Sequence, residues 1–275
     1  MSALPRPSAL QMLHGFVVLA QKTAQTKLTY RLATLVSLLA SVTSYGVYLL
    51  VWLAIYRENP RPGPLSRDEM LAYLIVAFLV NSLLVMSVEL RFGQRIRSGL
   101  VASDLLRPIG FLALQMGQAA GDVLVNLVYA LPLFGVGYWF FGSALLPHDG
   151  VALALAVVSI GLGFLIAFGL SYLIVQASFV LQSGYGVFFL RASLHQVFSG
   201  LSAPLVMFPR QLRAVAEALP FHHEIETPAR IWLGLVAWPE ALRLMAWQAA
   251  WGVGLLAAGE LILSAVMRRH QVQGG

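Results

Sequence analysis

The chain has 275 residues, of which 59% are hydrophobic and 11% are charged, and its mean hydropathy is +0.77. This composition excludes an ordinary soluble domain and is typical of an integral membrane protein, which we expect to be all-α and to form one transmembrane domain over residues 1–275. The net charge of +6 does not indicate nucleic-acid binding, because the basic residues lie mainly at the ends of apolar segments and form no continuous basic face.

The first expected element is an amphipathic helix over residues 8–28. Apolar residues recur there at helical spacing and face polar residues: Leu10, Leu13, Val17 and Val18 against Gln11, His14, Gln21, Lys22 and Gln25. A helix of this kind lies in the membrane interface. We interpret it as an N-terminal elbow helix on the cytoplasmic side; the alternative is an extension of the first membrane span.

Six segments follow that are apolar enough to be transmembrane helices. They cover residues 32–56, 71–90, 120–141, 151–175, 187–207 and 242–267. At a rise of 1.5 Å per residue, about 20 residues cross the roughly 30 Å hydrocarbon core of a bilayer. The sequence therefore predicts six membrane spans.

The start of the third span can be placed in two ways. One long span begins at Ile109, or a short amphipathic helix ends near Ala119 and a span covers 120–141. We prefer the second division, because it keeps Gln115, Gln118 and Asp122 near the inner interface, where a charge costs less than at the bilayer centre.

Residues 93–108 form a short loop between two apolar runs, and the stretch from Arg91 to Pro108 carries four arginines. Short loops rich in Lys and Arg remain on the cytoplasmic side. With this loop inside, both termini are predicted to be cytoplasmic, and the Lys and Arg residues divide into eleven inside and seven outside. An alternative role for these arginines is to set topology only.

The region 208–240 is neither a clean span nor a plain loop. Short apolar pieces alternate there with four prolines: Pro209, Pro220, Pro228 and Pro239. Broken backbone is tolerated at membrane depth only where protein covers it. We therefore expect a short re-entrant helical hairpin on the external side, between spans five and six.

Motifs for catalysis or for metal binding are missing from the sequence. It lacks the glycine-rich loop that holds nucleotide phosphates, and no Ser, His and Asp set has the setting of a nucleophile elbow. The cluster His222-His223-Glu224 with Glu226 lacks the HExxH spacing of zinc enzymes, and the chain has no cysteine. We expect no catalytic residue, no metal site and no cofactor bound by this chain.

Three charged residues lie within the spans or at their inner ends: Asp122, Arg191 and Glu260. An ion pair such as Glu260 with Arg191 would offset the cost of burying these charges, and would indicate a cavity or a gating contact. The alternative is that the side chains snorkel to the inner interface.

Two motifs resemble those of a known family. Ile96-Arg97-Ser98-Gly99, followed by Asp104-Leu105-Leu106-Arg107-Pro108, resembles the I-x-x-G and L-L-R-P signature of ABC-2 type permeases, in the branch of viologen and multidrug exporters. A second match begins at Phe198-Ser199-Gly200 and continues through Pro204, Phe208-Pro209, Leu219-Pro220-Phe221 and the segment Pro228 to Gly234.

The resemblance implies a permease subunit that forms a homodimer or heterodimer with a second permease and pairs with a separate ATPase, which binds ATP and Mg. It implies export of an amphiphilic, drug-like or lipid-like substrate across the inner (cytoplasmic) membrane. The loop 93–108 would be a coupling helix that contacts the ATPase through Arg95, Ile96, Arg97, Ser98, Gly99, Asp104, Leu105, Arg107 and Pro108. The re-entrant region would depend on Gly200, Pro204, Pro209, Pro220 and Phe221.

Two other functions fit the residues alone. In a proton-coupled secondary transporter, Glu260 or Asp122 would carry the proton. In a membrane scaffold without transport activity, the many glycines of the spans would serve close helix packing.

Overall fold

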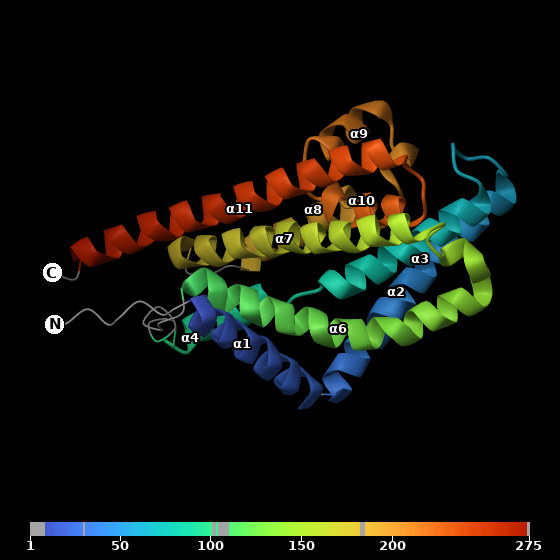
Figure 1. Cartoon of the computed structure of the whole chain (residues 1–275). Helices are drawn as coiled ribbons and strands as arrows, with labels where there is room; N and C mark the ends of the chain where they lie inside the picture. Colours follow the sequence, from blue (N-terminus) through green and yellow to red (C-terminus); the bar gives the residue numbers. More distant parts are fainter. Residues whose placement is uncertain (1–8, 30, 101–102, 104–109, 182–184, 274–275) are drawn as a thin grey trace.

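The computed structural model describes residues 9–29, 31–100, 103, 110–181 and 185–273. All regular elements in these ranges are helices, and the long ones run side by side in a bundle (Figure 1). We name the two ends of the bundle by the short helices that they hold. The α4 end, at the left of Figure 1, also receives the end of α11, and the α9 end lies toward the right.

The long helices are α2 (Arg31–Glu58), α3 (Arg67–Leu84), α6 (Phe111–Phe141), α7 (Gly150–Leu181) and α11 (Trp238–Gln273). Shorter helices stand between or beside them: α1 (Ala9–Thr29), α4 (Val88–Arg97), α8 (Tyr185–Phe198), α9 (Arg210–Glu217) and α10 (His222–Trp232), with 3-10 turns η1 (Gly142–Leu145) and η2 (Leu205–Met207).

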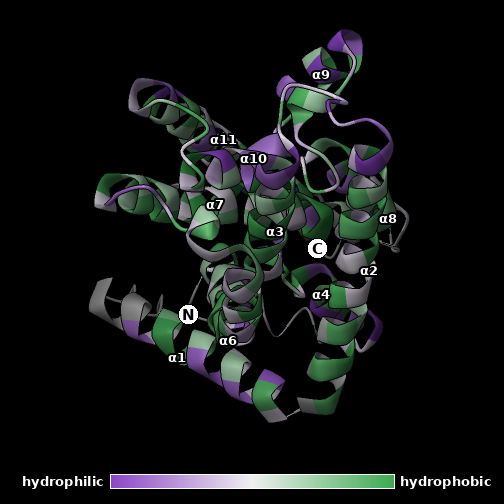
Figure 2. Cartoon of the chain, turned by 90° about the vertical axis from the view of Figure 1, so that its right-hand side faces the viewer, coloured by the Kyte–Doolittle hydropathy of each residue, from purple (hydrophilic) through white to green (hydrophobic). Residues whose placement is uncertain are grey.

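Five stretches of described helix are long and apolar enough to cross a membrane. They are Leu35–Glu58, Arg67–Arg97, Phe111–Leu145, Gly150–Ser178 and Trp238–Arg268. Many large apolar side chains of these helices are exposed, among them Leu39, Trp139 and Val253, and Figure 2 shows that the long helices are largely apolar, as expected for a protein that faces lipid. The chain is therefore a multi-pass, all-helical membrane protein.

Two predicted spans differ from the structure. The segment 71–90 is not one helix, because α3 ends at Leu84 and α4 begins at Val88. The segment 187–207 holds α8, which has 14 residues and ends at Phe198. The helix stops there because Gly200 adopts a φ of +81°, a left-handed conformation that glycine takes without steric cost. A helix of 14 residues is about 21 Å long, shorter than the hydrocarbon core, so a sixth span at this position stays a prediction.

The division of the third span at Ala119 was wrong. The structure has a single continuous helix α6 of 31 residues, Phe111–Phe141, which contains Gln115, Gln118 and Asp122. A span over 120–141 was preferred because it keeps Asp122 near the interface, and an unpaired charge is costly in lipid. In the structure, Asp122 lies inside the protein and faces Arg91 and Lys27, so the helix needs no interruption.

The core of the bundle surrounds α3 and α10. Tyr73, Met70 and Ala77 of α3 are buried together with Ile225 and Ala229 of α10. The helix α10 packs on α3, α7 and α11, and every residue from His222 to Ala229 is buried. The predicted re-entrant region thus contains a helix that the bundle encloses; whether it enters the membrane stays a prediction.

The amphipathic helix α1 packs directly across α6. Two glycines of α6 allow this contact: a Cβ on Gly117 would lie 3.2 Å from Leu19 Cβ, and one on Gly121 would lie 2.5 Å from the carbonyl oxygen of Ala20. Small residues at such crossings let two helix backbones approach closely. The helix α1 is therefore part of the helical bundle.

Candidate functional site

The helix that begins at Arg67 breaks at Val85–Ser87, and side chains of α6 occupy this break. Asn126 Nδ2 donates hydrogen bonds to the carbonyl oxygens of Leu83 (3.1 Å) and Val85 (2.7 Å), and the backbone N–H of Ser87 donates to Asp122 Oδ2 over 2.9 Å. Backbone groups that a helix would satisfy internally are thus satisfied by side chains. Specific side-chain contacts therefore stabilise the break between Leu84 and Val88.

Two cations complete this arrangement. Arg91 Nη1 donates to both carboxylate oxygens of Asp122, over 3.0 and 2.8 Å, and Lys27 Nζ lies 3.6 Å from Asp122 Oδ1 and donates to Asn126 Oδ1 over 2.8 Å. Burial lowers the pKa of Lys27, while Asp122 acts in the opposite direction. We call Lys27, Arg91, Asp122 and Asn126 the hinge clamp. It joins α1, α4 and α6 at the point where α3 ends.

A second charged cluster joins the first turns of α4 and α10. Arg191 of α8 donates from Nη1 to Glu89 Oε1 (3.1 Å) and from Nη2 to the carbonyl oxygen of Ala167 (3.3 Å), and its Nη2 lies 3.7 Å from Glu224 Oε2. His195 Nδ1 is 3.3 Å from the same glutamate oxygen, and its Nε2 is 3.1 Å from Asn81 Oδ1. We call Glu89, Arg191, His195 and Glu224 the charge bridge.

The carboxylates of the charge bridge are almost completely buried, so they need positively charged or hydrogen-bonding partners to offset the cost of burial. The side chains of Glu89 and Glu224 are 5% and 1% exposed. An isolated buried carboxylate would be strongly unfavourable, and an arginine between two of them offsets this cost. The charge bridge therefore ties α4, α8 and α10 into one unit.

The helix α10 is also fixed to α7 and α11 by uncharged contacts. Gln248 Nε2 donates to the carbonyl oxygens of His223 (2.8 Å) and Ser159 (3.1 Å), and Ser159 Oγ donates to Gln248 Oε1 over 2.8 Å. Gly163 of α7 lies against the same turn, since a Cβ there would be 2.9 Å from the carbonyl oxygen of Glu224. Buried polar contacts and the close approach at Gly163 thus hold α10 to α7 and α11.

The predicted coupling motif Ile96-Arg97-Ser98-Gly99 forms the C-terminus of α4. Gly99 has a φ of +70°, and its N–H donates to the carbonyl oxygen of Ile96 (3.1 Å). The N–H of Leu100 donates to the carbonyl oxygen of Arg95 (3.0 Å). This is a Schellman motif, which requires a residue that accepts the left-handed conformation. The spacing of the I-x-x-G motif therefore has a structural cause.

The remaining predicted coupling residues, Asp104, Leu105, Arg107 and Pro108, lie outside the described residues. Arg95 is described, and its Nη2 donates to the carbonyl oxygen of Leu100 over 3.4 Å. Arg97 is the last residue of α4. The role of this segment in contacting a partner stays a prediction.

The intramembrane pair suggested between Glu260 and Arg191 does not form. Glu260 Oε1 accepts a hydrogen bond from the Tyr172 hydroxyl over 2.6 Å, whereas Arg191 contacts Glu89 and Glu224. The suggestion failed because sequence gives the number of charges and their positions along the chain, but not which helices are neighbours. Glu89 and His195 belong to the charge bridge, and the sequence analysis missed both.

The predicted re-entrant residues surround the start of α9 and α10. Gly200 lies against Tyr73, whose hydroxyl donates to the Gly200 carbonyl oxygen over 2.7 Å, and a Cβ on Gly200 would be 2.6 Å from that hydroxyl. Pro204 and Pro209 immediately precede η2 and α9, and Pro220 and the buried Phe221 precede α10. The structure thus brings Gly200 and α10 together around α3.

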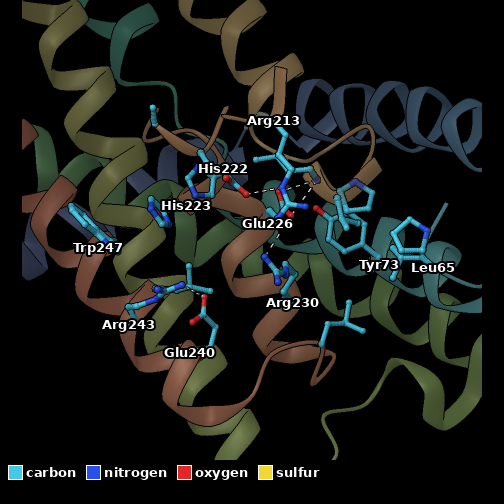
Figure 3. Close-up of a pocket in the computed structure, with 18 of the residues that line it drawn as sticks. Leu65, Tyr73, Arg213, His222, His223, Glu226, Arg230, Glu240, Arg243 and Trp247 are labelled. Carbon is cyan, nitrogen blue, oxygen red and sulfur yellow. Dashed lines mark hydrogen bonds and ion pairs between the residues drawn. The ribbon is translucent and has the colours of Figure 1, made fainter. Parts of the chain in front are cut away.

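A cavity of about 770 Å³ lies between α9, α10 and the first turns of α11, with Glu226, His222 and His223 in its wall (Figure 3). Burial raises the pKa of Glu226 to about 7 and lowers that of His223 to about 3; it also lowers the pKa of His222. Among the described residues, no group of three His, Asp or Glu side chains has the arrangement of a metal site.

Comparison with protein-family models gives one match that covers most of the chain: residues 42–274 match the model described as ABC-2 family transporter protein. The chain belongs to the ABC-2 family. It is therefore a permease, the membrane component of an ABC transporter, as the motifs at Ile96 and Phe198 indicated. No curated protein matches this permease.

Proposed function

We propose that this permease exports an amphiphilic, drug-like or lipid-like substrate from the cell, driven by a separate ABC ATPase. The ATPase binds ATP and Mg, and the permease contributes the membrane path together with a second permease, identical or related. It lies in the inner (cytoplasmic) membrane, with both termini and the segment 93–108 in the cytoplasm. The choice of substrate class follows the resemblance of the two motifs to the viologen and multidrug exporter branch.

The observation that carries the proposal is the contact of Arg191 with both Glu89 and Glu224. Glu89 lies in the first turn of α4, whose last turn holds the predicted coupling residues Arg95 and Arg97. Glu224 lies in the first turn of α10, beside the cavity at the α9 end. A force applied to α4 by an ATPase would reach α10 through these buried charges.

The hinge clamp supports the same mechanism. The helix α3 has 18 residues and is about 27 Å long, so the break at Val85–Ser87 falls close to one surface of the hydrocarbon core. There, α4 lies outside the helical hydrogen-bond ladder of α3; it is held by the pairs of Arg91 with Asp122 and of Glu89 with Arg191 and by the buried side chains of Val88 and Phe92. It is suited to tilt as a short lever between the partner and the bundle.

The experiment is reconstitution of the permease with its cognate ATPase in lipid vesicles. In the double variant Arg95→Ala with Arg97→Ala, we expect stimulated ATP hydrolysis and substrate efflux to fall at least tenfold. The matched control is Arg57→Ala with Arg61→Ala, which removes the same charges from the opposite end of the bundle. Unchanged hydrolysis and efflux in the Arg95 and Arg97 variant would refute the coupling role, and efflux that persists without ATP would refute an ATP-driven exporter.

A further inference from the structure

The cavity at the α9 end is lined by charges of both signs. Three arginines and three glutamates line it: Arg213 and Glu217 from α9, Glu226 and Arg230 from α10, and Glu240 and Arg243 from α11. The close-up in Figure 3 shows Arg213, Glu226 and Arg230 on one side of the cavity and Glu240 and Arg243 on the other.

These six residues form three arginine and glutamate pairs. Arg213 Nε lies 2.7 Å from Glu217 Oε1, Arg243 Nη2 lies 2.7 Å from Glu240 Oε1, and Arg230 Nη1 lies 3.9 Å from Glu226 Oε1. Each guanidinium has five N–H donors, so these single contacts leave donor capacity toward the cavity. The formal charges of the three pairs cancel.

Two tryptophans of α11, Trp247 and Trp251, also line the cavity. Trp247 is 59% exposed, lines the same cavity and lies beside Leu244 and Trp251. Tryptophan is enriched where a membrane protein meets the boundary between headgroups and hydrocarbon. The candidate span Trp238–Arg268 includes all three of these residues, so this side of the cavity adjoins the lipid-facing surface.

A ligand that suits this cavity has a charged head of both signs and an apolar tail. A phosphate is recognised by arginine donors, an amine by the carboxylates and by the face of a tryptophan ring, and acyl chains by the exposed apolar surface of α11. A purely anionic head would face Glu217 and Glu240, and Glu226 whenever it is deprotonated, as well as three arginines. The balance of charge therefore favours a zwitterion over an anion.

We infer that this cavity binds the headgroup of a zwitterionic amphiphile that carries a phosphate and a primary amine, such as phosphatidylethanolamine. The site belongs to the permease alone, so it goes beyond the proposed ATP-driven export and does not need the ATPase. The ligand has two sources: a bilayer lipid that stays bound, or the amphiphile that is transported.

The test is lipid binding to the purified full-length permease, measured by native mass spectrometry after delipidation. Phosphatidylethanolamine and phosphatidylglycerol with the same acyl chains are titrated separately. We expect at least fivefold greater retention of phosphatidylethanolamine. Equal retention of the two lipids, or a preference for phosphatidylglycerol, would overturn the inference.

Two variants separate the charges of the site. Arg213→Ala with Arg243→Ala removes phosphate donors, and we expect phosphatidylethanolamine retention to fall at least fivefold, whereas Arg57→Ala with Arg61→Ala leaves it unchanged. Glu217→Gln with Glu240→Gln makes the site positive and is expected to shift the preference toward phosphatidylglycerol. Equal behaviour of the site variants and the control variant would overturn the inference. All four site residues are at least 38% exposed, so the changes do not disturb the core.

A further arm identifies the source of the ligand. The complex with the ATPase is reconstituted with phosphatidylethanolamine whose headgroup amine is accessible to a labelling reagent only from one side. ATP-dependent movement of the lipid between leaflets assigns it as cargo, and retention of the bound lipid through ATP turnover assigns it as a resident lipid. Both outcomes support the site, and a failed ATPase complex leaves the binding measurement intact.

Discussion

Arg191 of α8 donates a hydrogen bond to Glu89 of α4 over 3.1 Å, although 102 positions separate the two residues in the chain. The guanidinium also faces the buried carboxylate of Glu224 on α10. One arginine thus holds together helices that come from the second quarter of the chain and from its last third.

Replacement of Arg191 by Gln is expected to destabilise the permease by about 3 kcal/mol or more, because a buried carboxylate that loses its partner keeps its desolvation cost. The measurement is thermal unfolding in detergent. The double variant Arg191→Gln with Glu89→Gln removes both members of the closer pair and should recover part of the loss. A melting temperature of Arg191→Gln equal to that of the unchanged protein would contradict the buried bridge.

The second prediction concerns the hinge clamp. Asp122→Ala removes the acceptor of the Ser87 N–H and the partner of Arg91, and we expect a loss of about 3 kcal/mol. Hydrogen exchange at Val85–Ser87 should rise in this variant. The control is Asp68→Ala, which removes an exposed carboxylate paired with Arg67 and should cost less than about 1 kcal/mol. Equal costs for the two variants would show that the clamp adds no stability.

The third prediction tests the packing of α1. Gly121→Ala places a Cβ 2.5 Å from the carbonyl oxygen of Ala20, so α1 must move, at a cost of about 1–3 kcal/mol. Gly135→Ala on the same helix meets nothing within 4 Å and should be neutral or stabilising. Limited proteolysis within α1 is the measurement. Equal cleavage in both variants would mean that α1 does not pack at Gly121.

The fourth prediction follows from the pKa of Glu226, which burial raises to about 7 from an ordinary value of 4.5. The folded protein then binds this proton more tightly than the unfolded chain. The contribution of this proton to the free energy of unfolding is complete below pH 4.5. It is lost as the pH rises toward 7, by about 3 kcal/mol in total.

The measurement is the difference in melting temperature between the unchanged protein and Glu226→Gln, followed from pH 4.5 to 7.5. The difference should move in favour of Glu226→Gln as the pH rises. The pKa of His223 is lowered in both proteins, so the effect of its titration on the melting temperature cancels in the difference. A difference that is constant over this range would contradict the raised pKa.

The positions of several long helices were accessible from the sequence, because long apolar runs have few alternatives to a helix in lipid. The predicted spans 32–56, 151–175 and 242–267 each fall within one helix of the structure. The family assignment was also accessible, and the match over residues 42–274 confirmed it. Its I-x-x-G motif reflects the local geometry of a helix end at Gly99.

The sequence did not show how charges pair between helices. The continuous helix α6 was missed because Asp122 was treated as a charge facing lipid, when Lys27 and Arg91 come from elements 95 and 31 positions away. Glu89 and His195 gave no signal, since isolated polar residues near the ends of spans are common. Their partners, Arg191 and Glu224, come near them only in the folded bundle.

The crossing of α1 and α6 has a consequence for biosynthesis. Lys27 reaches Asn126, a residue 99 positions later in the chain, so α1 leaves the ribosome long before the glycine-lined groove that receives it exists. During that interval the face of α1 that later packs on α6 has no partner from that helix. The close contacts of α1 at Gly117 and Gly121 therefore form only after α6 has been synthesised.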